Sequence, residues 1–201
     1  MRPIEGAVVH GGPRISESGW MTMFERFESQ RDVYGYHLGA ALTMEHDWLA
    51  LLPMLIDSAR SDDVEDLFEF RAAQTRHQIA ELNGLFEMLD LAPAQYPSPA
   101  SSALVRSESA FLGKCAPALR EGVAVASATM LDGVRLASYV ILFETLPDDV
   151  HPMARVRVGS LLADARRAHD ELLVVLRERG VATAPGAPAL SHRDTSEGAA
   201  S

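Results

Sequence analysis

Apolar residues recur at spacings of three and four along most of this chain, as they do in amphipathic helices. The period-two alternation that is typical of half-buried strands is not evident. The pattern predicts long helices over residues 33–57, 64–90, 118–146 and 152–179, and a short amphipathic helix over residues 102–112.

The connections between these helices predict the topology. Residues 58–63 form a short turn, with Asp62 or Asp63 as the cap of the second long helix, and Pro147 begins another short turn. Short turns make consecutive helices antiparallel. Residues 91–101 are proline-rich and longer, so they form a crossover that carries the short helix between the second and third long helices. The fold class is therefore all-α, an antiparallel four-helix bundle.

The two ends of the chain differ from its middle. Residues 1–17 contain adjacent glycines and a proline with little periodicity, and residues 182–201 run through Ala, Pro, Gly and Ser to a polar end. Such segments bury little apolar surface, so we expect both to be disordered or loosely attached. The helical domain should span residues 18–181.

Composition excludes several classes of partner. The 201 residues carry a formal net charge of −10, which disfavours binding to nucleic acid or to anionic membranes. Cys115 is the single cysteine, so no internal disulfide can form and a reducing compartment is expected. We find no signal peptide and no stretch that is apolar for long enough to span a bilayer. These features predict a cytoplasmic protein.

Several charged residues fall on the apolar sides of the predicted helices. Glu45 lies on the apolar stripe of the first long helix and Asp132 at the centre of the stripe of the third, with Arg135 at its edge. His169 lies on the stripe of the fourth long helix and Asp164 at its margin. Burying a charge costs several kcal/mol unless the charge is paired or bound to metal. These residues are the candidate site.

Two interpretations of this group remain open on spacing alone. Carboxylates and a histidine on facing helices are the ligands of di-iron and di-manganese bundles. A buried network in which Arg135 pairs with one of the two acids explains the same pattern without metal, and we favour it. The second helix offers only Thr75 on its stripe, with Gln78 and Gln74 progressively further from it.

Four segments, taken in order, resemble the YciE/YciF-like family of bacterial ferritin-like stress proteins. The resemblance covers roughly residues 34–178. The segments are residues 44–55, residues 74–82 with Phe86, residues 103–112 in the crossover and residues 136–139. The resemblance implies a ferritin-like bundle that holds a two-metal carboxylate site.

The ligand positions implied by the resemblance are only partly retained. Glu45 stands where the family has its first-helix glutamate, and Asp132 replaces a glutamate of the third long helix. Arg135 occupies a second acidic position of that helix. Ala73 and Gln74 stand where the family has paired glutamates.

The last helix shows the same losses. Asp164 and Asp170 match acidic positions of the family, but Ala165 and Arg166 replace acidic neighbours. Hard divalent metals need several anionic oxygens, and a guanidinium adds a permanent positive charge. We therefore predict a degenerate metal site in which Arg135 replaces the metal as counter-charge.

The favoured function is that of a non-enzymatic stress or interaction protein without a cofactor, in the form of a homodimer. Met44, Trp48 and the small residues of the first long helix are the expected dimer contacts. One alternative is an iron- or manganese-dependent oxidase, peroxidase or catalase-like enzyme. Another is a bundle in which Arg135 binds a small anionic ligand. The ligands of the metal alternative would be Glu45, Asp132, His169 and Asp164.

Overall fold

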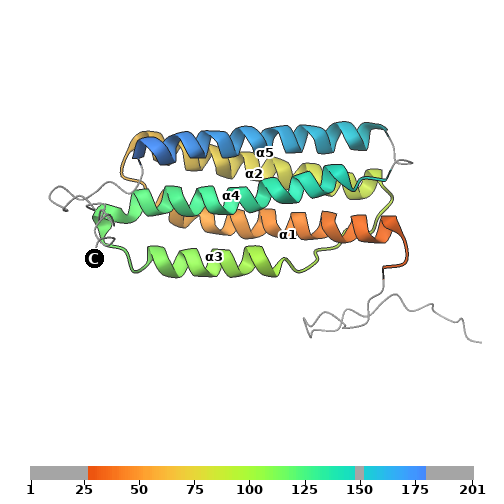
Figure 1. The fold of residues 1–201 in the computed structure, drawn as a ribbon, viewed down its shortest axis with the longest axis horizontal. Coiled ribbons are helices and arrows are strands. Elements are labelled where there is room, and N and C mark those ends of the chain that lie inside the picture. Colours follow the sequence, from red (N-terminus) through yellow and green to blue (C-terminus); the bar gives the residue numbers. More distant parts are fainter. Residues whose placement is uncertain (1–26, 148–151, 180–201) are drawn as a thin grey trace, which may run out of the picture.

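The computed structural model describes residues 27–147 and 152–179, and within these ranges every regular element is helical (Figure 1). The prediction of an all-helical fold is confirmed for these residues. The segments predicted to be loose, 1–17 and 182–201, lie outside the described residues. The elements are α1 (Gln30–Ile56), α2 (Asp62–Met88), α3 (Pro99–Leu112), the short 3₁₀ turn η1 (Pro117–Leu119), α4 (Arg120–Glu144) and α5 (Pro152–Arg179).

The helix boundaries follow local capping chemistry. α1 begins three residues before the predicted start because Ser29 and Asp32 form a reciprocal capping box. Ser61 occupies the N-cap position of α2 without a side-chain capping hydrogen bond, so the predicted cap residues Asp62 and Asp63 lie in the first turn of the helix instead. Acidic residues there interact favourably with the positive end of the helix dipole. α3 begins at Pro99, where the fixed φ of proline suits a first helical turn.

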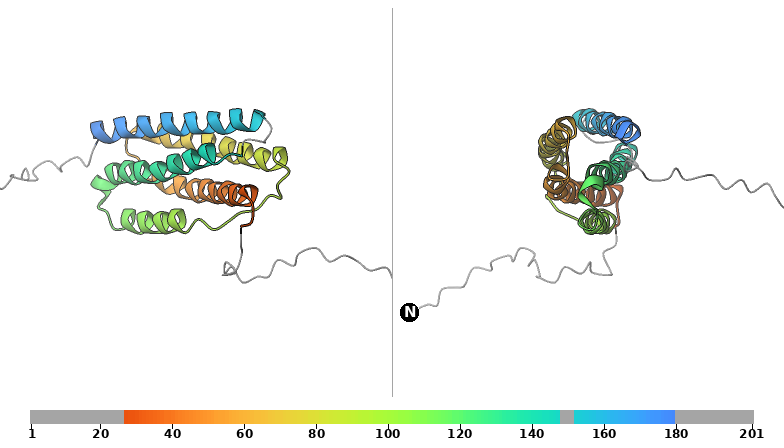
Figure 2. Two further views of the ribbon diagram at one scale, coloured as in Figure 1. Left: turned by 45° about the vertical axis from the view of Figure 1, so that its right-hand side comes forward. Right: turned by 90° about the vertical axis from the view of Figure 1, so that its left-hand side faces the viewer.

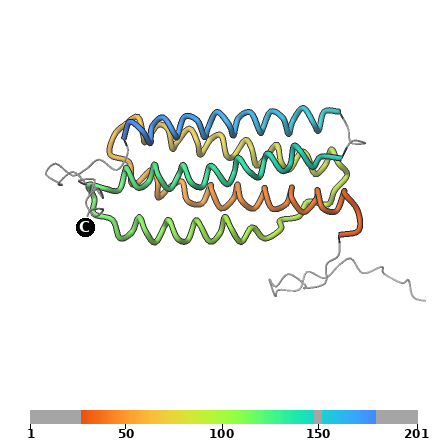
Figure 3. Tube along the Cα trace, in the orientation of Figure 1, coloured from red at the N-terminus to blue at the C-terminus, as the bar shows by residue number. Residues whose placement is uncertain are grey.

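Consecutive helices run in opposite directions along the molecule (Figure 3). Seen end-on, the four long helices lie side by side around a common core, in the order α1, α2, α5, α4 (Figure 2). α3 lies outside this group and packs against α1 and α4. The crossover therefore returns to cover one side of α1.

The apolar core is divided into two clusters along the helices. One contains Leu38 and Leu42 of α1 together with Tyr139 of α4, and the other contains Trp48 of α1 and Leu131 of α4. Glu45 lies between these two groups in the sequence of α1. The inward-facing charged residues thus form a polar layer between two apolar ones.

α4 contains a long apolar stretch. Together with η1, it is long and apolar enough to cross a membrane by length and composition, with a hydropathy of 1.3 in its most apolar window. By that measure, our prediction that no stretch qualifies is wrong. Half of that window is buried inside the protein, and α4 contributes to both core clusters. Its composition is explained by its place in the core, which makes it weak evidence for a membrane span.

Candidate functional site

Glu45 of α1 and Arg135 of α4 form the centre of the polar layer. The Glu45 side chain is fully buried, and that of Arg135 is 1% exposed. The Arg135 Nε donates to Glu45 Oε1 over 3.1 Å, and its Nη2 donates to Glu45 Oε2 over 3.1 Å. Two parallel hydrogen bonds of this kind are the strongest pairing available to a carboxylate and a guanidinium.

The other groups around Arg135 complete its coordination. Its Nη1 donates to Asp132, one turn earlier on α4, and its Nη2 also donates to Gln78 Oε1 over 2.5 Å. The guanidinium carbon lies 5.4 Å from the centroid of the Trp48 ring, within the range of a cation–π contact. Every nitrogen of the guanidinium is therefore engaged, and an anionic ligand would have to displace a protein group.

The electrostatics of the pair reflect burial and mutual attraction. Burial raises the pKa of Glu45, although Arg135 and a hydrogen bond of 2.8 Å from the Tyr139 hydroxyl partly oppose this. Burial alone would lower the pKa of Arg135, but Glu45 and Asp132 outweigh it and raise that pKa. Burial and the Glu45 carboxylate raise the pKa of Tyr139 well above its usual range. Arg135 is thus a permanent cation in this layer.

A second buried guanidinium, Arg71 of α2, was missed by the sequence reasoning. It is 1% exposed and donates to Gln74 Oε1, to the Ala168 carbonyl and to Glu171, each over 2.8 Å. Burial lowers its pKa, and the nearby Asp132 carboxylate opposes that shift. Arg71 lies four residues before Thr75, a helical spacing that could have placed it on the same inward face.

Several atoms of this layer have no hydrogen-bond partner within the described part of the chain. The Nδ1 of His169 lies 3.7 Å from the Oδ2 of Asp132, too far for a hydrogen bond. Buried polar atoms in this situation usually bind ordered water. The atoms are Arg71 Nε, Thr75 Oγ1, Gln78 Nε2, Asp132 Oδ2 and His169 Nδ1.

The structure thus brings together four of the five predicted site residues. Glu45, Asp132 and Arg135 are in contact, and His169 of α5 borders Asp132 with a side chain that is 22% exposed. Asp164 is not drawn into this contact and instead pairs with Arg167, one turn later on the same helix. The sequence left open which acid pairs with Arg135, and the structure shows that both do.

The donor set does not fit a two-metal centre. Both oxygens of Glu45 accept hydrogen bonds from Arg135, and one also accepts from Tyr139. A divalent ion bound to these oxygens would lie beside a guanidinium in a low-dielectric interior, where like charges repel strongly. Within residues 27–147 and 152–179, no group of three or more His, Cys, Asp or Glu side chains is arranged to hold a metal ion.

The residues expected at a dimer contact are buried within the chain rather than exposed. Met44 and Trp48 are only 3% and 1% exposed, because α3 covers this side of α1. Gly39 is covered as well, since a Cβ there would lie 2.5 Å from the Tyr96 ring. The prediction that Met44, Trp48 and the small residues of α1 form an accessible contact face is therefore wrong for these residues.

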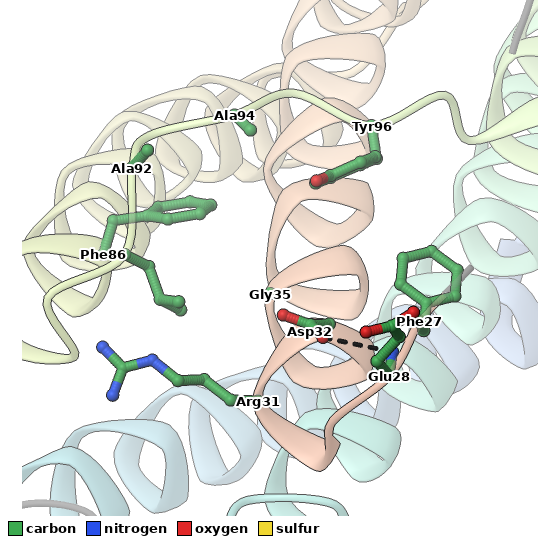
Figure 4. Close-up of a pocket in the computed structure, with 10 residues that line it drawn as sticks. Phe27, Glu28, Arg31, Asp32, Gly35, Phe86, Ala92, Ala94 and Tyr96 are labelled. Carbon is green, nitrogen blue, oxygen red and sulfur yellow. Dashed lines mark hydrogen bonds between the residues drawn. The ribbon is translucent and has the colours of Figure 1, made fainter. Parts of the chain in front are cut away.

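A separate pocket of about 400 Å³ lies where the start of α1 meets the crossover (Figure 4). Arg31 lies on one side of it and Phe27 on the other, with Tyr96 across from both. Arg31 is already engaged, because its guanidinium donates to the carbonyls of Leu89 and Asp90. The pocket contains no buried charge, so the charge network around Arg135 remains the stronger candidate site.

Comparison with known proteins identifies the family of this chain. Residues 29–148, more than half of the chain, match the family described as "Domain of unknown function (DUF892)". The chain belongs to this family. It is a YciF-like protein, so the resemblance seen in the sequence is confirmed. No curated protein matches the sequence.

Two solved structures share the fold of this family member. YcfI from Rhodopseudomonas palustris, described as a proposed structural protein, superposes with a TM-score of 0.71 at 20% identity, covering 78% of this chain and 99% of YcfI. The Escherichia coli stress protein YciF superposes with a TM-score of 0.69 at 16% identity, covering 76% of this chain and 97% of YciF. At these identities the likeness extends to the fold alone.

Proposed function

We propose that this protein is a ferritin-like antiparallel four-helix bundle of the bacterial stress-protein type, in which an internal ion-pair network has replaced the metal site. In this proposal it acts in the cytoplasm through contact with a protein partner and carries no cofactor. The observation that carries the proposal is the pair of hydrogen bonds from Arg135 to both oxygens of Glu45.

Charge balance supports this reading. The buried side chains of the layer balance in charge, because Glu45 and Asp132 contribute two negative charges and Arg135 and Arg71 two positive ones. The Glu171 carboxylate, which pairs with Arg71, is 59% exposed. A buried layer that is neutral without an ion gains little from binding one. Adding two divalent cations would leave the layer strongly positive, and their repulsion from the guanidiniums would be weakly screened.

The description of the relatives is compatible with the proposal. YcfI is described as a proposed structural protein and YciF as a stress protein, and neither description names a reaction. A helical scaffold whose interior is held by its own ion pairs suits such a role, because its stability would not depend on the supply of a metal.

Metal analysis tests the proposal directly. The full chain would be expressed with added iron or manganese and its metal measured by mass spectrometry after gel filtration. We expect well below one equivalent per chain, unchanged in Glu45→Ala and in the surface control Glu87→Ala. About two equivalents per chain, lost in Glu45→Ala but kept in Glu87→Ala, would overturn the proposal.

A further inference from the structure

An apolar groove of about 560 Å³ lies between the end of α3 and the start of α4, two helices that run side by side (Figure 1). Phe111 of α3 and Met130 of α4 line it with side chains that are 53% and 44% exposed. Val123, which is 7% exposed, connects the lining to the core. The volume is within the range of about 300–1,000 Å³ that is usual for small-molecule sites, and such walls favour an occupant with an apolar body.

The unpaired charge at this groove is positive. Glu108 and Lys114 are the charged residues that line it, and the Glu108 carboxylate already accepts a hydrogen bond from the Ser127 hydroxyl. The exposed ammonium of Lys114 makes no ion pair within the described part of the chain. Arg120 adds a cation nearby, because its Nε donates to the Cys115 carbonyl over 3.2 Å. Even with Glu108 counted, the two cations leave this end of the groove positive, so an anionic head group is complementary to it.

We propose that the groove binds one molecule of a free long-chain carboxylate, a fatty acid, with its chain along the apolar lining and its head on Lys114. A neutral apolar molecule would leave the ammonium unused, and a cationic amphiphile would be repelled by it. The groove is lined by other residues than the polar layer around Arg135. The inference therefore goes beyond the proposed function and does not depend on whether that layer holds metal.

The charge of the whole chain favours a single free molecule over a lipid surface as the source of this carboxylate. The net charge of −10 disfavours approach to an anionic membrane, which presents a broad plane of negative charge. A single carboxylate has to meet only the positive end of the groove. It can be held there by Lys114 while its chain is removed from water.

The groove carries a natural reporter group for its own occupancy. Cys115 lines it, is the single cysteine of the chain and is partly exposed. A molecule that fills the groove should shield this thiol from a neutral alkylating reagent such as iodoacetamide. Shielding can therefore be measured on the unaltered full chain, without an introduced label.

Isothermal titration with dodecanoate, kept below its micelle concentration, measures the binding directly. We expect one equivalent per chain with a Kd of about 10 µM. Butyrate has the same head group but a short chain, and should bind at least about 100-fold more weakly, because each buried methylene contributes roughly fourfold. Dodecylammonium has the same chain and the opposite charge, and should not shield Cys115 at the concentration where dodecanoate does.

Two matched pairs of variants assign the binding to the groove. Lys114→Gln should weaken dodecanoate binding at least about tenfold, whereas Arg106→Gln removes an exposed cation elsewhere on α3 and should leave it unchanged. Lys114→Arg keeps the charge and should keep the binding. Phe111→Ser should weaken binding by removing an apolar wall, whereas Val174→Ser, at a position that is 47% exposed on α5, should not.

Alkylation of Cys115 gives the second measurement. At about ten times the Kd of dodecanoate roughly nine chains in ten are occupied, so alkylation should slow at least about fivefold. The same concentration should give little shielding in Lys114→Gln. Unchanged alkylation at saturation, no saturable binding up to about 1 mM, or equal weakening by both members of either variant pair would overturn the inference.

Three other outcomes would assign the groove to a different occupant and overturn the inference as well. Uptake of dodecanoate only where micelles form would show an adventitious additive only. Sedimentation with phosphatidylcholine vesicles, lost in Phe111→Ser and kept in Val174→Ser, would assign the groove to a lipid surface. Alkylation of Cys115 that slows with rising protein concentration, without dodecanoate, would assign it to a second copy of the chain.

Discussion

Arg135 and Glu45, on adjacent helices α4 and α1, are joined by two hydrogen bonds of 3.1 Å inside a fully buried layer. The pair ties together two helices that are separated by α2 and the crossover in sequence. Asp132 and Gln78 fix the remaining sides of the guanidinium, so the position of α2 is linked to the same group. One side chain thus sets the relative placement of three helices.

Removing the guanidinium should destabilise the protein severely. Arg135→Met keeps much of the side-chain volume but removes the guanidinium that hydrogen-bonds both Glu45 and Asp132, and leaves Arg71 as the remaining buried cation of the layer. We expect a loss of about 3–5 kcal/mol in the free energy of unfolding, measured by urea denaturation. The double variant Glu45→Gln/Arg135→Met should recover part of that loss, because one of the two carboxylates left without the guanidinium is gone.

Arg167→Met is the matched control for this experiment. It breaks the Arg167–Asp164 pair, in which the arginine side chain is 69% exposed, and exposed pairs contribute under about 1 kcal/mol. If Arg135→Met were no more destabilising than Arg167→Met, the buried network would have no special part in stability.

Glu121 should contribute stability that depends on pH. Its carboxylate accepts hydrogen bonds from the Arg60 and Ser61 backbone N–H groups over 2.6 and 2.9 Å, beside the start of α2. Burial alone would raise the pKa of Glu121, but these hydrogen bonds outweigh it and hold the pKa below its ordinary value of 4.5. Because the folded-state pKa is depressed, the stabilisation is present above about pH 4.5 and is lost as the pH falls through the folded-state value.

We therefore expect Glu121→Gln to cost about 1–2 kcal/mol at pH 7 and progressively less at acidic pH, measured by denaturation at a series of pH values. Glu87→Gln, at an exposed position in the last turn of α2, should show no such loss at any pH. A cost for Glu121→Gln that stays constant down to pH 3 would contradict the linkage.

Helical periodicity predicted most of the fold and the centre of the site. The burial of Glu45, Asp132 and Arg135 could be predicted from the spacing of apolar residues along each helix. That spacing can be read without knowing how the helices pack. Gln78 was predicted to lie off the apolar stripe of α2, but its side chain is fully buried. Because α2 packs against both α1 and α5, the buried face of the helix is wider than the apolar stripe. The burial of Trp48 could not be predicted from α1 alone, because it depends on α3 folding back over that helix.

If Arg135 has taken the place of a metal, restoring acidic residues should restore metal binding. Arg135→Glu combined with Gln78→Glu removes the guanidinium and adds two carboxylates beside Glu45 and Asp132. We expect this variant to bind up to about two equivalents of iron or manganese and to gain thermal stability on metal addition. The control, Arg167→Glu with Asn83→Glu, adds equal charge at exposed positions and should not bind metal tightly. If circular dichroism showed the first variant to be folded and it still bound no metal, the idea that the site geometry is retained would be contradicted.

The crossover approaches α1 closely at Gly39 but not at Gly35, and this difference can be tested by substitution. A Cβ at Gly39 would lie 2.5 Å from the Tyr96 ring and 2.6 Å from the Ala94 carbonyl oxygen, whereas one at Gly35 would lie 3.9 Å from its nearest neighbour. Alanine is the better helix former at both positions, so the difference between the variants isolates the steric effect. We expect Gly35→Ala to be neutral or stabilising by up to about 1 kcal/mol. Gly39→Ala should lower the free energy of unfolding by about 1–3 kcal/mol, because the backbone at Ala94 must move. Thermal unfolding of the two variants measures the difference. Equal stability would show that the crossover does not pack tightly against α1.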